Sequence, residues 1–426
     1  MAGTGRETAS GKRVVVIGAG IVGMATASYL QRDGHQVTVL DPGGPGEGAS
    51  LGNAGCLNGS SVVPVSMPGV LPQVPRWLFD PLGPLAIRWR YLPVLLPWLW
   101  QFVRAGQPER VRLQAKALRA LLAPSIETYQ PLIKAAGAED LLFRLGHLFA
   151  YTSEASFAKD ATAMDLRKAN GVAIDELSED ELRQLEPHLS RAYVRARLIS
   201  ENGHLGDPLR LVQKLAEAFQ RAGGAIHRER ATGFAFEGAR VSGVRTEAAT
   251  HTADAAVIAA GAWSKPLARA LGDSVPLDTE RGYHVMVRDP EVCPRIPTMS
   301  GDGKFVATPM EGGLRFAGTV EFGGLKAPPD WRRARTLLAQ GQEMYPGLAR
   351  TMPEERLSLW MGFRPSLPDS LPIISPARRH ANAFYAFGHG HVGMAAGSMT
   401  GRLVADLVGG RKPTIDPKPF SVERFF

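Results

Sequence analysis

The sequence predicts a two-domain protein of the α/β (α+β) class, in which a discontinuous Rossmann-like domain alternates along the chain with a second, mixed-sheet domain. Three observations lead to this prediction. The chain has 426 residues, which is enough for two domains. It opens with a complete βαβ pattern. Sheet-like segments of the same kind then return only near residues 207–264 and 355–408.

The opening βαβ pattern is the clearest local signal in the chain. Residues 13–17 form an apolar, β-branched run that is typical of a buried strand. Apolar residues from Ile21 to Leu30 suit a buried helix, and Val37–Leu40 suits a second strand. Asp41 then stands at the carboxyl end of that strand. An acidic residue in this place is typical of dinucleotide-binding units.

A glycine fingerprint of the form GxGxxG joins the first strand to the helix. Gly18 permits a tight turn, Gly20 lets the backbone approach a pyrophosphate, and Gly23 lets helix and strand pack closely. The helix N-terminus offers N–H groups to phosphates, and Asp41 can accept hydrogen bonds from an adenosine ribose. The pattern therefore predicts a dinucleotide site, whose further contacts are expected from Ala19, Ile21 and Val22.

The rest of the chain alternates between helical and strand-like segments. Asp207 is a good N-cap, Pro208 suits the first helical position, and the amphipathic run Leu209–Arg221 ends at a pair of glycines. Further helices are expected at 107–136, 154–170, 330–344 and 394–408. Further strands are expected at 145–152, 225–230, 231–237, 240–247, 255–260, 283–288, 305–310 and 314–318.

The order of these segments distinguishes two kinds of dinucleotide-binding protein. In a common NAD dehydrogenase, a second βαβ half follows the first directly. Here the second strand leads into a glycine-rich stretch, 43–59, and then into an irregular region, 60–106. A cofactor domain assembled from separate stretches favours a flavoprotein. The expected cofactor-binding segments are 1–80, 190–275 and 355–426, and the expected substrate-domain segments are 81–189 and 276–354.

Three further motifs accompany the βαβ unit. They are Ala49–Gly55, the strand-then-glycine run Ala255–Ser264, and the pair Gly362–Ile374 with Ala386–Gly393. Together they resemble the FAD-dependent D-amino-acid oxidase/dehydrogenase superfamily, most closely its bacterial D-amino-acid dehydrogenase branch. The resemblance implies FAD as the cofactor. It also implies cofactor contacts from Ser50, Asn53, Ala54, Gly55, Gly261, Trp263, Gly362, Gly388, His389, Gly390, His391, Val392 and Gly393.

The resemblance also implies which residues meet the substrate. FAD itself accepts the hydride, so the protein need only bind, orient and tune. A planar guanidinium is the best partner for a carboxylate, and Arg364 lies in the motif where the family places such an arginine. Tyr283 is expected to cover the substrate or bond its carboxylate, and His284 to line the pocket. The alternatives are a structural salt bridge for Arg364 and ordinary sheet packing for the other two.

The implied reaction is oxidation of the Cα–N bond of an amino acid, with a D-amino acid favoured. Hydride would pass from Cα to flavin N5, and the imine would hydrolyse to a 2-oxo acid and ammonia. Three alternatives remain open at this point. The substrate could be a secondary amine of the proline, hydroxyproline, sarcosine or opine type. Oxygen could accept the electrons, or the chain could be a flavin-binding subunit without its own substrate.

The two cysteines carry no expected chemistry. Cys56 and Cys293 lie far apart and form neither a disulfide framework nor a metal motif, so no metal site is expected. In related dimethylglycine-type enzymes, a histidine near the flavin loop carries the flavin covalently. This chain has Asn53 and no histidine there, which predicts non-covalent FAD with Cys56 as a packing residue.

Charge and hydropathy bear on the partners of the protein. The net charge is +8, but the basic residues are scattered without an aromatic–basic stripe, so no nucleic acid is expected. The first twelve residues contain no apolar signal sequence, which predicts a cytoplasmic protein with a loose leader.

Residues 77–103 are rich in Trp and Leu, and Tyr91–Val103 is their longest uncharged run. That run is too short to span a bilayer, which needs about 20 apolar residues. The segment predicts either a buried wall of the substrate domain or a peripheral contact with the inner face of the cell membrane. In the second case a quinone would be the electron acceptor.

Overall fold

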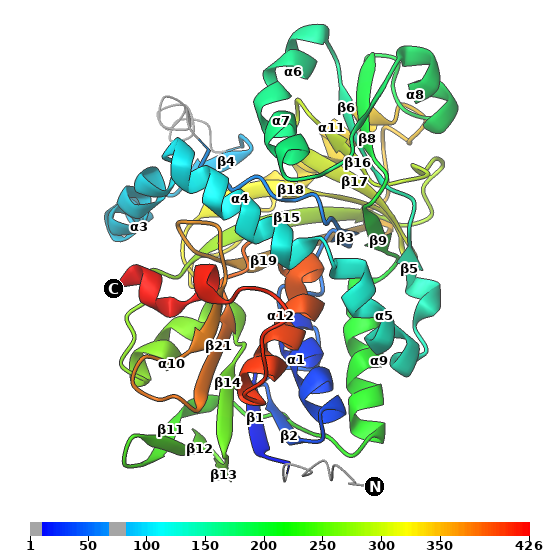
Figure 1. Cartoon of the computed structure of the whole chain (residues 1–426). Helices are drawn as coiled ribbons and strands as arrows, with labels where there is room; N and C mark the ends of the chain where they lie inside the picture. Colours follow the sequence, from blue (N-terminus) through cyan, green and yellow to red (C-terminus); the bar gives the residue numbers. More distant parts are fainter. Residues whose placement is uncertain (1–10, 68–81) are drawn as a thin grey trace, which may run out of the picture.

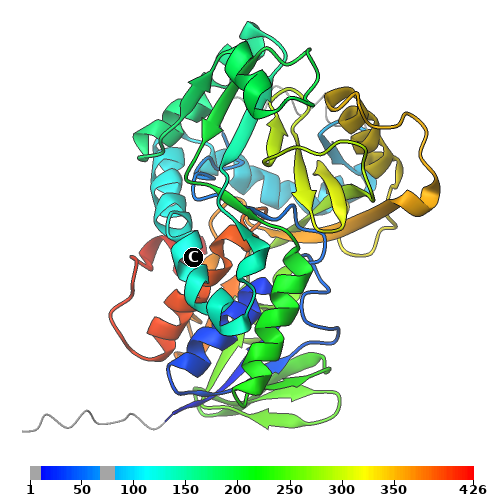
Figure 2. The same cartoon turned by 90° about the vertical axis from the view of Figure 1, so that its right-hand side faces the viewer.

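The computed structural model describes residues 11–67 and 82–426. Figure 1 shows a lower part that contains both the first strand and the last helix, and an upper part built around a larger sheet. Figure 2 shows the same two parts from the side, with the upper part above the ends of the lower strands. The chain crosses between the parts several times, which confirms the two-domain α/β class and the discontinuous organisation.

The lower domain is built on a six-stranded sheet. Its order is β10 (Ala225–His227), β2 (Gln36–Leu40), β1 (Arg13–Ile17), β14 (Ala255–Ile258), β21 (Ala383–Phe387) and β20 (Ile373–Pro376). The first five strands are parallel, and β20 runs antiparallel to β21. A parallel sheet is covered on both faces, which explains why its strands read as continuous apolar runs.

Alternate residues of β1 supply two separate cores, one on each face of this sheet. Val14 and Val16 face a helical layer, and Val15 and Ile17 face the other side. The helical layer contains α1 (Ile21–Arg32), α4 (Pro108–Leu122), α5 (Ser125–Ala136), α9 (Pro208–Arg221) and α12 (Gly393–Val408). The other face carries β11 (Ala231–Glu237), β12 (Arg240–Thr246), β13 (Thr250–Thr252) and α10 (Ser264–Ala270).

The upper domain is built on a nine-stranded mixed sheet. Its strands are β19 (Leu357–Ser366), β15 (Asp278–Val287), β18 (Gly313–Phe322), β17 (Phe305–Met310), β16 (Thr298–Ser300), β6 (His147–Tyr151), β8 (Arg195–Ile199) and β7 (Asp175–Leu177), with β4 (Leu85–Ile87) paired to the end of β18. One face packs against α11 (Arg332–Met344) and α8 (Glu179–Leu185). Ala317 of β18, with Trp360 and Arg364 of β19, borders the cavity described below.

Short elements complete the chain. A small sheet joins β3 (Cys56–Leu57), β9 (Gly203–Leu205) and β5 (Leu142–Phe143). The upper domain also carries α6 (Glu154–Lys159) and α7 (Ala161–Ala169). The helices expected at 107–136 and 154–170 are thus each divided in two. In the first case the division falls at Pro124, which has no N–H to continue the helical hydrogen bonds.

The expected domain boundaries differ from the observed pairing in three places. Strand β8 lies in the expected cofactor segment 190–275 but pairs with β6 of the upper sheet. Strand β19 lies in the expected segment 355–426 but pairs with β15 along its whole length. Helices α4 and α5, expected in the substrate domain, pack in the core with α12. Hydrophobic period identifies a strand or helix but not the sheet that it joins, which explains these differences.

The Trp-rich segment forms a short 3-10 helix, η2 (Trp89–Tyr91), followed by α3 (Leu92–Ala105). Leu95 and Trp98 are buried against Ile87 and Phe322. The segment thus packs against the large sheet, in agreement with the expectation of a buried wall, while another side of it remains exposed. Residues 77–81 of this segment and residues 1–10 of the expected leader lie outside the described residues. Within the described parts of the chain, no helix has the length and apolar character needed to cross a bilayer.

Candidate active site

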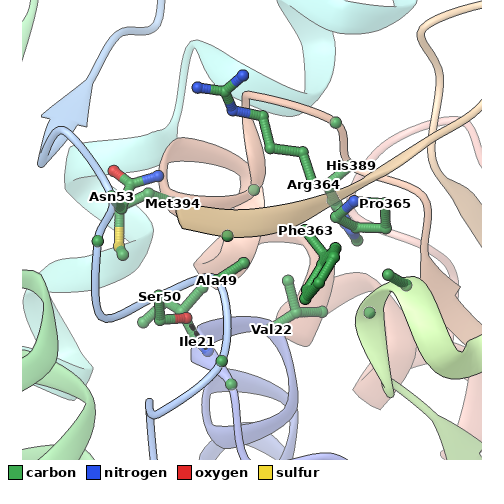
Figure 3. A pocket seen from close by; sticks show the side chains of 18 of the residues that line it. Ile21, Val22, Ala49, Ser50, Asn53, Phe363, Arg364, Pro365, His389 and Met394 are labelled. Atoms are coloured by element: carbon green, nitrogen blue, oxygen red, sulfur yellow. Dashed lines mark hydrogen bonds between the residues drawn. The ribbon is translucent and has the colours of Figure 1, made fainter. Parts of the chain in front are cut away.

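A cavity of about 900 Å³ runs from the glycine turn after β1 to the face of the large sheet. The residues that border it come from the turn, from the end of β2, from the loop at 47–54, from β18 and β19, and from the start of α12. Figure 3 shows the middle of this cavity, where the loop carrying Ser50 and Asn53 lies opposite β19 and the start of α12. The four motifs of the sequence therefore meet at one place.

The glycine turn has the geometry that its spacing predicts. Gly18 has φ +111°, and a Cβ there would lie 2.3 Å from the carbonyl oxygen of Ala259. A Cβ on Gly23 would lie 1.8 Å from the carbonyl oxygen of Gly18, so helix and strand are in close contact. A Cβ on Gly20 would meet only Ser50 Oγ, at 3.6 Å. The space next to Gly20 thus belongs to the cavity and fits a close-lying phosphate.

Asp41 borders the cavity at the end of β2, where an adenosine ribose is expected. Its Oδ2 accepts a hydrogen bond from the N–H of Ala19 at 2.7 Å, and its Oδ1 accepts one from the N–H of Gly43 at 2.8 Å. A carboxylate has about four acceptor positions, so both oxygens can still accept from ribose hydroxyls. Ala19 itself does not border the cavity and acts through this hydrogen bond, whereas Ile21 and Val22 border it directly.

The loop at 49–55 is held from both domains. Ser50 Oγ accepts from the N–H of Ile21 at 3.1 Å, which ties the loop to the N-terminus of α1 (Figure 3). Asn53 Oδ1 accepts from the N–H of Gly55 at 2.8 Å, and Arg315 donates to the carbonyl oxygen of Asn53. Ser50, Asn53 and Ala54 border the cavity. Gly55 lies behind them, with φ +73°.

The segment before α12 supplies the opposite wall. His389, Gly390, His391, Val392 and Gly393 border the cavity. Gly388 does not, because it packs against Leu367.

The two histidines of this segment differ. His389 shares a hydrogen bond of 2.9 Å with Thr400 Oγ1, and burial lowers its pKa to about 3. His391 has an exposed side chain that borders the cavity, and desolvation by the cavity walls, with the charges of Arg364 and Arg167, lowers its pKa to about 4. Both rings are therefore neutral near pH 7.

Arg364 projects from β19 into the cavity, on the opposite side of the strand from Phe363 (Figure 3). Its Nη1 donates to the carbonyl oxygen of Thr319 at 2.9 Å. Across the strand pair, a Cβ on Gly282 would lie 2.3 Å from the guanidinium carbon, so the guanidinium lies against a residue that has no side chain. Within residues 11–67 and 82–426, no carboxylate forms an ion pair with Arg364, which argues against a purely structural salt bridge. Burial lowers the pKa of Arg364, and the nearby charge of Glu280 partly offsets this.

Tyr283 and His284 are placed differently from the expectation that they contact the substrate. The ring of Tyr283 packs in the core on the α11 side of the sheet, although the residue borders the cavity. Its hydroxyl donates to Glu321 Oε2 at 2.7 Å and accepts from the N–H of Asp330 at 3.0 Å. Strand alternation places neighbouring side chains on opposite faces, so only His284 faces the cofactor loop.

His284 supports the loop rather than lining the cavity. Its Nδ1 lies 3.0 Å from the carbonyl oxygen of Gly52, and its ring stacks on Trp360 with a centroid distance of 5.2 Å. Desolvation, together with the charge of Arg315, lowers the pKa of His284 to about 3. The neutral ring can then donate from Nδ1 to the loop carbonyl, which makes His284 a positioning residue.

Several residues that border the cavity carried no recognisable signal in the sequence. Trp360 shares a strand face with Gly362 and Arg364, so the period of two could have identified it. The others come from loops or single strand positions without a motif. They are Asn58, His147, Arg230, Thr232, Lys304 and Thr319.

The remaining predicted positions are Gly261, Trp263 and Gly362, which all border the cavity. Trp263 makes an edge contact with Phe363 at a centroid distance of 5.7 Å. Cys56 also borders the cavity, and burial raises the pKa of its thiol to about 12, so it is not a thiolate nucleophile at neutral pH. The described residues contain no group of three side chains that could hold a metal ion.

This arrangement fits FAD. The cavity is open next to Gly20, begins at the N-terminus of α1 and continues past a glycine-rich wall to Arg364, which has no ion-pair partner in the described parts of the chain. A long dinucleotide with an isoalloxazine ring requires such a combination. The fold and the site therefore define a flavin-dependent oxidoreductase.

Comparison with known proteins identifies the family. The model of the FAD dependent oxidoreductase family DAO matches residues 13–407, and the chain belongs to this family. A D-amino-acid oxidase of Bradyrhizobium diazoefficiens is 46% identical over 97% of this chain and 99% of its own length. A protein of Mesorhizobium japonicum named D-amino acid dehydrogenase 2 is 30% identical over 95% of this chain and 98% of its own.

The solved structures agree on the fold. The L-proline dehydrogenase of P. horikoshii superposes with a TM-score of 0.73 at 18% identity, covering 98% of both chains. The expected superfamily and FAD as the cofactor are thereby confirmed. The protein is an FAD-dependent oxidoreductase.

Proposed function

We propose that this protein oxidises the Cα–N bond of D-amino acids, giving an imine that hydrolyses to a 2-oxo acid and ammonia. One observation carries the proposal. At the end of the cavity that borders the large sheet, the guanidinium of Arg364 forms no ion pair with any residue that the structure describes. Bound FAD supplies the hydride acceptor. The relatives named D-amino-acid oxidase and D-amino acid dehydrogenase support the same reaction.

The protein's own residues would bind and orient the substrate. Arg364 would hold the α-carboxylate through the donors that Thr319 does not use, since a guanidinium can form two parallel bonds to a carboxylate. Gly282 leaves the room for this guanidinium, and the carbonyl of Thr319 fixes its orientation. The neutral ring of His391 adds a polar group to the same cavity without adding a second charge.

An anaerobic substrate panel tests this function. The purified holoenzyme is mixed with D-alanine, L-alanine, L-proline, sarcosine and no substrate, and bleaching of the flavin absorbance is followed. Rapid bleaching by D-alanine, with slow bleaching by L-alanine, is the expected result. Preferential bleaching by L-proline or sarcosine would assign the enzyme to secondary amines instead. An absence of bleaching with every amine would favour a flavin-binding subunit without its own substrate.

We further infer that α3 and the start of α4 bind the surface of an anionic membrane. Large apolar side chains are exposed here, with exposed fractions of 74% for Trp89, 63% for Val94, 66% for Trp100 and 69% for Leu113. Basic residues surround them, namely Arg90, Arg104, Arg110, Arg112 and Lys116. Glu109 is the single acidic residue between 88 and 119. Apolar insertion and attraction to anionic lipid both favour this contact.

A membrane location supports a quinone as the electron acceptor, although the relative at 46% identity is named an oxidase. Flotation with phosphatidylglycerol vesicles at low salt tests the surface. The double change Trp89→Ser with Trp100→Ser should abolish flotation, whereas the control Phe236→Ser, which alters an exposed side chain of β11, should not. Flotation that survives the double change would refute this surface. Peroxide formation in air at the rate seen with a soluble quinone would assign oxygen as the acceptor.

A further inference from the structure

We propose that the preferred substrates are acidic amino acids, whose side-chain carboxylate is bound through the cation Lys304. This inference rests on the proposed oxidation of amino acids and names the class within it. It starts from the charges around the sheet end of the cavity. Those charges are positive, and a single α-carboxylate does not balance them.

Lys304 lies in the loop between β16 and β17 and borders the cavity. Strands β17 and β18 pair with Phe305 opposite Gly318, and one further step of this antiparallel register places Lys304 opposite Thr319. The carbonyl of Thr319 also receives the hydrogen bond from Arg364. The backbone positions of the two cations therefore flank the same residue. A substrate held at its α-carboxylate by Arg364 has its other groups within reach of this loop.

In the described parts of the chain, the ammonium group of Lys304 forms no ion pair, and the side chain is exposed. Its backbone has φ +55°, a left-handed conformation that is unfavourable for a residue other than glycine or asparagine. A strained position that presents a cation to a cavity agrees with a binding role.

A third cation acts on the same end of the cavity. Arg167 of α7 lies over the ring of Phe149, with its guanidinium carbon 5.2 Å from the centroid, and its Nη1 donates to the carbonyl oxygen of Ala163 at 3.2 Å. No carboxylate of the described residues forms an ion pair with it. Its charge helps to lower the pKa of both His147 and His391, which border the cavity. Arg167 does not itself border the cavity, and the charge of Asp160 acts on it, so Lys304 and Arg364 are the cations that border the sheet end.

Among the described residues, no acidic side chain borders this end of the cavity. The acidic side chains that border the cavity are Asp41 and Glu47. Both belong to the nucleotide end, where Asp41 bonds the N–H of Ala19 and Glu47 bonds the N–H of Gly44. His147 and His391 stay neutral at pH 7 because their pKa values are lowered to about 3 and about 4. Glu280 lies opposite Arg364 on the neighbouring strand and partly offsets its charge, whereas no acidic side chain of the described residues forms an ion pair with Lys304.

This balance selects the substrate by charge. An α-carboxylate on Arg364 leaves the charge of Lys304 without a partner, and a neutral side chain does not supply one. A second carboxylate, as in aspartate or glutamate, is attracted by Lys304. An amide of the same size offers similar hydrogen bonds without the charge. The pairs D-glutamate with D-glutamine and D-aspartate with D-asparagine therefore isolate the effect.

The test measures kcat/KM of the holoenzyme for D-glutamate and D-glutamine, and takes their ratio. The wild type should favour D-glutamate by about tenfold or more, which is the value of one charge-assisted contact. Lys304→Met should reduce this ratio toward one, chiefly through KM for D-glutamate. Lys304→Arg should restore much of it. The control Lys412→Met, which removes an exposed lysine elsewhere, should leave the ratio unchanged.

Two results would overturn the inference. One is equal kcat/KM for D-glutamate and D-glutamine in the wild type. The other is a ratio that Lys304→Met leaves unchanged. Both are distinct from failure of the proposed function, in which no D-amino acid bleaches the flavin. Raising the salt concentration provides an independent check, since it should reduce the ratio in the wild type and have little effect in Lys304→Met.

Discussion

The change Gly282→Ala is expected to displace Arg364 without touching the cofactor. A Cβ at this position would lie 2.3 Å from the guanidinium carbon and from Nη2 of Arg364, and 2.7 Å from Nη1. Non-bonded carbon atoms normally stay about 3.5–4.0 Å apart. The guanidinium must therefore move by about 1 Å or more. On one side Gly282 pairs with Gly362 of β19, and on the other side the register with β18 shifts between Arg281 and Tyr283.

The size of the effect follows from the contact that is lost. A misplaced guanidinium forfeits at least one charge-assisted hydrogen bond to the substrate carboxylate, worth about 1.5–3 kcal/mol. This corresponds to a loss of about ten- to a hundredfold in kcat/KM. Arg364→Ala should lose at least as much. Arg364→Lys keeps the charge but not the planar fork, so it should fall between the wild type and Arg364→Ala.

The assay compares kcat/KM for D-alanine among holoenzymes with equal FAD content. Gly233→Ala is the matched control, because it also replaces a strand glycine, and its new Cβ would meet no atom within 4 Å. The double variant Gly282→Ala with Arg364→Ala should be no worse than Arg364→Ala, since both changes remove the same contact. Unchanged kinetics in Gly282→Ala would refute the role of Arg364. Fully additive losses in the double variant would refute the link between the two residues.

Three further predictions concern the cofactor and the stability of the fold. Gly20→Val should give folded protein without FAD, because the added side chain fills cavity space rather than meeting protein atoms. Circular dichroism checks the fold and flavin absorbance checks the FAD content, and a normal FAD content would contradict the prediction. Heat denaturation should release all FAD into the supernatant, as expected if Cys56 is an unreactive thiol, and protein-bound flavin after precipitation would contradict it. Burial raises the pKa of Glu186 to about 7 from 4.5, so between pH 4.5 and 7 the folded state keeps a proton that the unfolded state releases, and stability falls as pH rises. Glu186→Gln keeps an oxygen for the N–H groups of Arg295 and Ile296 and should remove this loss of stability. The variant should therefore be more stable than the wild type by roughly 3 kcal/mol at pH 8 but not at pH 4.5. Urea unfolding at the two pH values tests this, and an equal difference between variant and wild type at both would contradict it.

Local motifs were sufficient to predict the cofactor part of the site. The turn at Gly18, the acid at Asp41 and the loop around Ser50 each act through backbone geometry that the residue types dictate. Arg364 could also be predicted, because its motif and its chemistry both indicate a carboxylate partner. These positions needed no knowledge of the tertiary structure beyond the order of strand, turn and helix.

Contacts across strands could not be predicted in the same way. Tyr283 was expected to cover the substrate and His284 to line the pocket, but neighbouring residues of a strand face opposite sides, and the sequence does not tell which side holds the cavity. Lys304 and Trp360 carry no motif, and only the pairing of β15, β17, β18 and β19 brings them to the site. The surface formed by α3 could be seen as apolar, yet which of its tryptophans are buried depends on its packing against Phe322.

The sequence by itself determined the class of this protein and its cofactor, and it predicted the arginine that we propose as the carboxylate anchor. These depend on short stretches whose backbone conformation is fixed by glycine, by strand and helix period, and by a helix N-terminus. The tertiary structure decided which sheet β8 and β19 join, which side chains share the cavity and how its charges balance. Those properties arise from pairing between residues far apart in the chain, and a register shift of one residue would reverse the face of every side chain in a strand.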